Sequence, residues 1–185
     1  MAMDARSYAA SETLKDGTPV AIRAIRRDDA GTVLQAFRSL DRESVYRRFF
    51  SPKKDLSPSE LEQLTGVDFN RVVALVVTKA TENGEVLIGG GRYATDDPAS
   101  GAAEIAFMTD GTHRGLGIAS VILKHLQHIA QEAGVQRFEA EMLAENQPML
   151  AVFRGSGLPM NIVRDGSTLH VTLWLGSRKE QRHGT

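Results

Sequence analysis

The chain has 185 residues and no cysteine, and this single absence removes several kinds of chemistry. Without a thiol the protein has neither a disulfide, nor a thiolate nucleophile, nor a metal site with cysteine ligands. No apolar run approaches the roughly 20 residues that span a bilayer. The N-terminal sequence MAMDARSYAA also lacks the apolar segment of a signal peptide. We therefore expect a cytoplasmic protein.

An excess of charge of either sign is also missing, because 22 basic and 23 acidic residues leave a net charge of −1. Such a balance gives no overall attraction to nucleic acid or to anionic membranes, so neither is expected as a partner. A hydrophobic content of 42% in a chain of this length is enough for one packed core. We expect a single domain over residues 11–176, between flexible polar tails at 1–10 and 177–185.

The periodicity of the apolar residues predicts the order of the secondary-structure elements. Strands are expected at 12–15, 19–25, 72–79, 86–94, 103–109, 135–143, 160–164 and 169–175. Helices are expected at about 30–40, 43–50, 58–65, 118–133 and 147–156. The pairs Asp16-Gly17, Asn83-Gly84 and Asp165-Gly166 favour tight turns between paired strands. This order predicts an α+β fold in which helices flank a mixed sheet.

The most informative stretch is Ala103 to Ala119, AEIAFMTDGTHRGLGIA, in which an apolar strand leads through a polar turn into a helix. The first N–H groups of a helix lack intrahelical partners, and the peptide dipoles leave positive potential at that end. A phosphate group satisfies both. Gly115 and Gly117 have no Cβ, so the backbone can turn sharply and come close to an anion. The stretch therefore predicts an anion site.

Three kinds of nucleotide site compete for this turn. A P-loop requires a Lys-Ser/Thr pair after its second glycine, and the sequence has none there. A Rossmann turn places its first glycine directly after the strand, whereas five residues intervene here and Ser120 stands at the third glycine position. The third pattern, Arg/Gln-x-x-Gly-x-Gly/Ala, is matched by Arg114, Gly117 and Ala119. In this feature the chain resembles the GNAT superfamily of acyl-CoA-dependent N-acyltransferases, whose loop holds the coenzyme A pyrophosphate.

The resemblance covers nearly the whole chain and is closest to the catalytic domain of bacterial Pat-type protein lysine acetyltransferases. The matching segments are DGTPVAIRAIRRDD near the start, LDRESVYRRFF at 40–50, AEIAF at 103–107 and AENQPM at 144–149. It implies the GNAT fold, a mixed, mostly antiparallel sheet with splayed central strands flanked by helices. Many Pat-type proteins carry an additional cyclic-nucleotide-binding or synthetase-like region, and 185 residues leave room for neither.

The resemblance also implies the residues that bind acetyl-CoA, the expected co-substrate. Backbone groups of the strand end would hold the pantetheine arm, the turn would hold the pyrophosphate, and the asparagine before the last helix commonly contacts the coenzyme. These positions are Phe107, Met108, Thr109, Arg114, Gly115, Leu116, Gly117, Ile118, Ala119 and Asn146. Asn146 is followed by Pro148, so it is also a natural helix cap.

Glu104 is the candidate catalytic base. A lysine amine with a pKa near 10.4 is almost entirely protonated at neutral pH, so acyl transfer to it benefits from a base. Glu104 lies between Ala103 and Ile105, where desolvation would raise its pKa. From the residues alone, a solvent-facing or arginine-paired glutamate is an equal alternative. The matching glutamate in the family is the general base. Glu139 and Glu141 share one face of the next strand, and a solvated surface is the simpler explanation of both. They are secondary candidates for steering a cationic substrate or relaying a proton through water.

One position departs from the family pattern. Seven residues after the asparagine, many GNAT enzymes have a tyrosine thought to protonate the leaving thiolate, and here the residue is Phe153. Tyr93 and His170 are alternative donors, although each has a simple structural explanation. His125, His128 and Glu132 have helical spacing that metal ligands use, but a polar helix flank explains them better, and no metal is expected.

Together these features predict an acetyl-CoA-dependent N-acetyltransferase whose acceptor is a protein lysine, with AMP-forming acyl-CoA synthetases as targets by resemblance. Acceptor choice depends on loops rather than on the fold, so a small-molecule amine remains an alternative acceptor. A non-catalytic acyl-CoA sensor is a further alternative, which Phe153 favours and Glu104 opposes.

Overall fold

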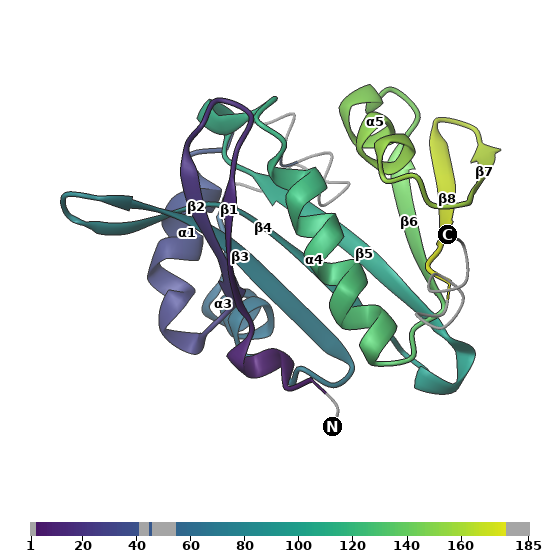
Figure 1. Ribbon diagram of the computed structural model, residues 1–185, viewed down its shortest axis with the longest axis horizontal. Coiled ribbons are helices and arrows are strands. Elements are labelled where there is room, and N and C mark those ends of the chain that lie inside the picture. The colour runs from purple at the N-terminus through teal and green to yellow at the C-terminus, as the bar shows by residue number, and fades with distance from the viewer. Residues whose placement is uncertain (1–2, 41–44, 46–54, 177–185) are drawn as a thin grey trace, which may run out of the picture.

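The computed structural model describes residues 3–40, 45 and 55–176, which form one eight-stranded sheet with helices on both faces (Figure 1). The strand order is β1-β2-β3-β4-β5-β6-β8-β7, and only the β5–β6 ladder of this sheet is parallel. The strands are β1 (Ala9–Thr13), β2 (Pro19–Ala24), β3 (Val72–Thr81), β4 (Gly84–Ala94), β5 (Ala102–Thr109), β6 (Arg137–Leu143), β7 (Met160–Asp165) and β8 (Thr168–Trp174). The helices are α1 (Ala30–Arg38), α3 (Pro58–Thr65), α4 (Ile118–Glu132) and α5 (Gln147–Gly155). The predicted α+β class is confirmed.

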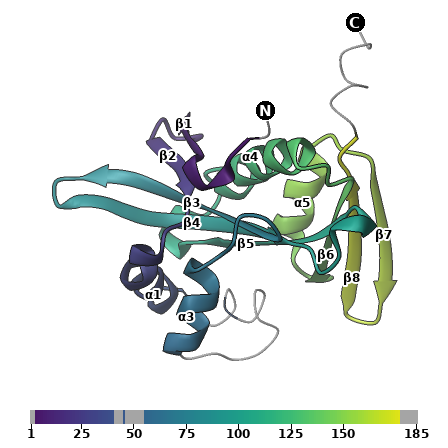
Figure 2. The same ribbon diagram turned by 90° about the horizontal axis from the view of Figure 1, so that it is seen from below.

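The sheet separates two hydrophobic cores, and β3 shows why its apolar run has no polar alternation. Val73, Leu75 and Val77 belong to the core beneath α4, whereas Ala74 and Val76 belong to the core beneath α1. Because successive side chains of a strand point to opposite faces, a strand covered on both sides must be apolar throughout. Figure 2 shows α1 and α3 on one side of the sheet and α4 on the other.

The predicted flexible tail over residues 1–10 is too long. Ala5–Ser7 forms a 3-10 turn whose N-cap, Asp4, accepts a hydrogen bond from the N–H of Arg6 at 3.0 Å. Ala9 already pairs with Arg23 as the first residue of β1, and Ala5 is buried. The sequence does not predict this structure, because the alanines and polar residues of this segment show no periodicity. Their burial depends on packing against distant strands.

Two other expectations fall outside the described residues: the short helix at 43–50, apart from Val45, and the tail at 177–185. The expected helix at 58–65 is confirmed as α3. Its start has a capping box, in which Ser57 accepts from the N–H of Glu60 at 3.1 Å while the Glu60 carboxylate accepts from the N–H of Ser57. Such reciprocal bonds satisfy two N–H groups that a helix start leaves unpaired.

The three consecutive glycines of β4 allow α4 to lie directly against the sheet. A Cβ at Gly91 would come within 2.5 Å of Ile122 Cγ2, and one at Gly89 within 2.6 Å of Ile118 Cγ2. Both distances are shorter than side chains tolerate, so these two glycines are required by a close approach rather than by a ligand. The ladder also has a bulge between Val77 and Thr78, which adds to the local twist.

Among the described helices, none is long and apolar enough to span a membrane.

Candidate active site

The central feature of the site is the point at which β5 and β6 separate. Their parallel ladder contains the pairs Ala102–Arg137, Ala103–Phe138 and Glu104–Glu139, and then it ends. In Figure 1 the two strands meet at one end and diverge toward the other. Beyond Glu104, the backbone groups of β5 that point away from β4 have no partner in β6, so they are available to a ligand.

A cleft of about 770 Å³ occupies the space between the diverging strands, and we call it the splay cleft. Its volume lies within the range of small-molecule and cofactor sites. Its walls come from β5, β6, the start of α4, and α5. Of the predicted coenzyme-binding residues, those that line it are Phe107, Met108, Thr109, Arg114, Gly115, Gly117, Ile118, Ala119 and Asn146.

Leu116 is the predicted coenzyme-binding residue that does not line the cleft. Its side chain packs against the core, and its carbonyl accepts a hydrogen bond from the N–H of Lys15 at 3.1 Å. The reason is the arrangement of the loop: Gly115 and Gly117 line the cleft, whereas the large apolar side chain of Leu116 between them packs toward the core. Leu116 therefore fastens the loop to the β1–β2 hairpin.

The loop between β5 and α4 has the geometry that the sequence predicted for an anion site. Gly115 and Gly117 have φ values of 76° and 89°, which strongly favour glycine. Gly117 is the N-cap of α4 and supplies no side-chain cap. The 15-residue helix therefore directs its N-terminal N–H groups and its positive dipole end toward the cleft.

Basic side chains surround the same loop, and one of them was missed by the sequence analysis. Lys15 lines the cleft from the β1–β2 turn, and its stem passes 3.3 Å from the position of a Cβ on Gly117. His113 also lines the cleft; its Nδ1 lies 2.9 Å from Asp110 Oδ2, and its Nε2 lies 3.1 Å from Lys79 Nζ. No local sequence signal connects Lys15 with a loop a hundred positions later.

Glu104 lies on the face of β5 toward α1 and α3, because Ala103, Ile105 and Phe107 occupy the opposite face in the core under α4. The burial expected from its neighbours is not found, and its side chain is exposed. Flanking residues of a strand point to the other face, so they do not desolvate it. The nearby Arg92 is half-buried; burial lowers the pKa of its guanidinium, and the negative charge of Glu104 opposes that shift.

Glu104 also lines a second cavity, of about 660 Å³, between α3 and the β4–β5 strands. We call it the acidic cavity, because Glu60, Asp68 and Glu104 contribute carboxylates and Arg92 is its one basic residue among those described. Three backbone N–H groups hydrogen-bond to Asp68 Oδ1 and lower the pKa of this carboxyl, which keeps it ionised. Glu104 thus stands at the contact between the splay cleft and the acidic cavity.

The carboxylates of Glu139 and Glu141 on β6 lie in different environments. Glu139 and Glu141 share the face of β6 opposite Phe138 and Ala140, as predicted. Glu139 Oε1 accepts a hydrogen bond from Arg137 Nε at 3.2 Å, so it is engaged in an ion pair. Glu141 is exposed and lines the splay cleft.

Phe153 lies in the wall of the cleft and is 1% exposed, with its ring 6.2 Å from that of Phe107. Neither of the alternative proton donors reaches this cleft. Tyr93 is packed in the core on Phe138, and burial raises the pKa of its hydroxyl to about 12. His170 lines none of the cavities described here.

Two polar side chains have structural partners. Asn146 caps α5, with its Oδ1 accepting from the N–H of Met149 at 3.3 Å, and it lines the cleft as well. His125 is buried between Tyr8 and Glu12, with Nδ1 2.5 Å from the tyrosine Oη and Nε2 2.7 Å from the glutamate Oε1. The residues described contain no group of three potential metal ligands.

The comparison with known proteins decides the family. The sequence profile of the acetyltransferase (GNAT) family matches residues 35–158, which is more than half of the chain. The chain belongs to the GNAT family. An acetyltransferase of Pseudomonas aeruginosa is 31% identical over 139 residues, which make up 75% of this chain and 74% of that protein.

Two Pat proteins are also similar to this GNAT chain. The acetyltransferase Pat of Mycolicibacterium smegmatis is 30% identical over 128 residues, or 69% of this chain, and the match covers only 38% of that longer protein. The crystal structure of the GNAT domain of S. lividans PAT superimposes with a TM-score of 0.81 at 30% identity. That match covers 90% of this chain and 96% of the other, which confirms the predicted fold and the resemblance to Pat-type catalytic domains.

Proposed function

We propose that this GNAT protein is an acetyl-CoA-dependent N-acetyltransferase that modifies a lysine side chain of a protein, with Glu104 as the general base. The observation that carries the proposal is the position of Glu104, which lines both the splay cleft and the acidic cavity. The first can receive the acyl donor and the second the acceptor, so a base between them faces both reactants.

The donor would lie in the splay cleft with its pyrophosphate on the loop before α4. The N–H groups at the helix start, together with Arg114 and Lys15, match the charge of the phosphates. The pantetheine arm would follow β5 and hydrogen-bond to backbone groups of Phe107, Met108 and Thr109. Asn146 would contact the coenzyme from the other wall while also capping α5.

The acceptor would enter through the acidic cavity. A lysine side chain is a cation on a slender apolar stem, and the carboxylates of Glu60, Asp68 and Glu104 attract such a group. Binding would cover Glu104 and remove it from water, which strengthens its interaction with the amine. Similarity to the two Pat proteins supports a protein acceptor, and AMP-forming acyl-CoA synthetases are the first targets to test.

The reaction would proceed by direct attack. Glu104 takes a proton from the acceptor amine, whose nitrogen forms a bond to the thioester carbon while the C–S bond breaks. The products are an amide and the coenzyme thiolate, which then takes a proton from water. Phe153 has no proton to give, but a thiol with a pKa near 8.5 is a tolerable leaving group without an acid.

The deciding experiment uses labelled acetyl-CoA, the purified protein and a whole-cell lysate. Label on lysines of proteins, lost when Glu104 is replaced by Gln, is the expected result. Label only in the metabolite fraction would assign a small-molecule amine acceptor, and coenzyme binding without label in either fraction would assign a sensor.

A further inference from the structure

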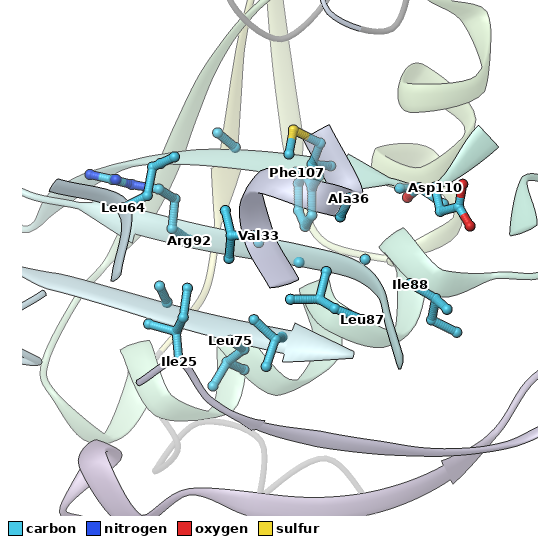
Figure 3. Close-up of a pocket in the computed structure, with 18 of the residues that line it drawn as sticks. Ile25, Val33, Ala36, Leu64, Leu75, Leu87, Ile88, Arg92, Phe107 and Asp110 are labelled. Atoms are coloured by element: carbon cyan, nitrogen blue, oxygen red, sulfur yellow. The ribbon is translucent and has the colours of Figure 1, made fainter. Parts of the chain in front are cut away.

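A third cavity lies under α1, against the face of the sheet formed by β3, β4 and β5. We call it the apolar cavity; it has a volume of about 90 Å³. Its walls are mostly aliphatic side chains and the glycine backbone of β4, with Phe107 and Thr109 from β5, and Arg92 and Asp110 are its charged residues among those described. Figure 3 shows Val33 and Ala36 reaching toward it from α1, beside Leu87 and Phe107.

Ala106 lines all three cavities. It follows Glu104 by two residues and therefore lies on the same face of β5. Its methyl group is small, so this position leaves room for a reacting group where a larger side chain would separate the cavities. The splay cleft, the acidic cavity and the apolar cavity thus meet at one point on β5.

During acyl transfer, three groups surround the thioester carbon and each needs its own space, and three cavities meet at this junction. One direction leads to the sulfur and the coenzyme, a second to the attacking amine, and the third to the carbon chain of the acyl group. The splay cleft and the acidic cavity account for the first two under the proposed function. An apolar cavity in the third direction is suited to a hydrocarbon chain and to neither of the charged reactants.

We propose that the apolar cavity binds the acyl chain, and that the protein uses propionyl-CoA and butyryl-CoA as donors in addition to acetyl-CoA. The proposal rests on the proposed function for the place of the coenzyme and of the acceptor. The bond changes are those of acetyl transfer: the amine nitrogen bonds to the carbonyl carbon, and the coenzyme leaves as a thiolate.

The size of the cavity limits the chain. Apolar cavities of roughly 150 Å³ hold benzene, so about 90 Å³ has room for roughly three or four carbons. Each methylene that leaves water on binding strengthens binding roughly fourfold. Butyryl-CoA has two methylenes more than acetyl-CoA, and its binding should be tighter by up to about fifteenfold. Decanoyl-CoA should lose this gain, because its chain exceeds the cavity.

The side chains of α1 and β4 set the available length. Ala36 is the smallest side chain that α1 presents to the cavity, so Ala36→Phe would fill it. Leu87 lines the cavity from β4, and Leu87→Ala would lengthen it. Gln35 is the matched control, because it is exposed on the same helix and does not line the cavity. Gln35→Phe therefore adds the same ring on the solvent side.

The test is calorimetric titration of the protein with acetyl-CoA, butyryl-CoA and hexanoyl-CoA, and it requires no acceptor. We expect wild type and Gln35→Phe to prefer butyryl-CoA over acetyl-CoA by roughly five- to fifteenfold. Ala36→Phe should reduce this ratio to near one. Leu87→Ala should shift the preference toward hexanoyl-CoA, and this result stands even if Ala36→Phe fails to fold.

Equal or weaker binding of butyryl-CoA by the wild type would overturn the proposal, and so would an unchanged ratio in both cavity variants. Lysine labelling with acetyl-CoA is measured in parallel on the same preparations. If the wild type labels no lysines, the proposed function is refuted. The butyryl-to-acetyl binding ratio decides the role of the apolar cavity independently.

Discussion

Glu104 of β5 and Glu139 of β6 form the last residue pair before the two strands diverge. Parallel pairing puts the two carboxylates side by side on one face of the sheet, which would be unfavourable if both were left uncompensated. Arg137 engages Glu139 through an ion pair. Glu104 instead faces the splay cleft and the acidic cavity, so one carboxylate of the pair is engaged in an ion pair and the other lines both cavities.

Replacing Glu104 by Gln should lower the rate of acetyl transfer by roughly 10² to 10⁴-fold, the usual contribution of a general base. Affinity for acetyl-CoA should remain, because the expected coenzyme contacts lie further along β5 and on α4. Steady-state rates and calorimetric binding measure the two effects separately. Glu145→Gln is the control, since this exposed glutamate lines none of the cavities. Turnover that survives Glu104→Gln near neutral pH would exclude Glu104 as the base.

Acetyl-CoA should raise the melting temperature of the protein. A ligand at a hundred times its dissociation constant stabilises the folded state by about 2.7 kcal/mol, which corresponds to roughly 5–10 °C for a chain of this size. Arg114→Ala should reduce the shift at a fixed coenzyme concentration. Differential scanning fluorimetry gives the measurement, and an unchanged melting temperature at saturating coenzyme would remove the argument for the loop.

Lys15→Met should weaken coenzyme binding by roughly five- to twelvefold, about 1–1.5 kcal/mol, because a solvent-facing phosphate contact contributes less than a buried one. Methionine keeps the apolar stem beside Gly117 and removes only the charge. The matched control is Lys124→Met, on the outer side of α4, where the lysine pairs with Glu12. Titrations at two salt concentrations should show a smaller salt dependence for Lys15→Met alone; equal affinities for the two variants would rule out the contact.

Gly91→Ala should destabilise the protein by about 1–3 kcal/mol, because the added methyl group meets Ile122 at the interface of β4 and α4. Gly31→Ala provides the opposite test. Gly31 lies in α1 with open space around it, so alanine should stabilise the helix by roughly 0.5–1 kcal/mol. Urea denaturation measures both changes, and the same sign for the two variants would show that the close approach of α4 is not the cause.

Asp29→Asn should make the free energy of unfolding depend less steeply on pH in acid. Burial raises the pKa of the Asp29 carboxyl, but bonds from Arg23 and from the N–H of Arg26 outweigh it, so the net shift is downward. A lowered folded pKa stabilises the protein above the unfolded value near 3.8, and that contribution disappears as the pH falls through the folded value. At pH 6 the variant should lose less than the roughly 3–5 kcal/mol of a broken buried pair, because Arg23 keeps Glu85.

The measurement is the free energy of unfolding between pH 2 and 6. Asp28→Asn is the control, since its side chain is 81% exposed. If the free energy of unfolding falls equally steeply toward low pH in wild type and in Asp29→Asn, the lowered pKa of Asp29 does not contribute to stability as described.

The features that the sequence predicted well are those with local causes. The loop glycines, the Ser57–Glu60 cap and the strand turns each depend on residues a few positions apart, and all of these elements are present. The features that it missed depend on the sheet register. Lys15 reaches the loop before α4 only because the β1–β2 hairpin packs against that loop, and Ala5 is buried only by distant strands. The exposure of Glu104 likewise depends on which face of β5 each core covers.

The short β5–β6 ladder has a mechanical consequence. With three residue pairs, it is the only strand pairing that connects the β1–β5 part of the described sheet with the β6–β8 part. A molecule bound in the splay cleft contacts both parts and so links them across this short ladder. The two parts should therefore move relative to each other less when the cleft is filled, and a single ligand should slow amide exchange in both β5 and β6.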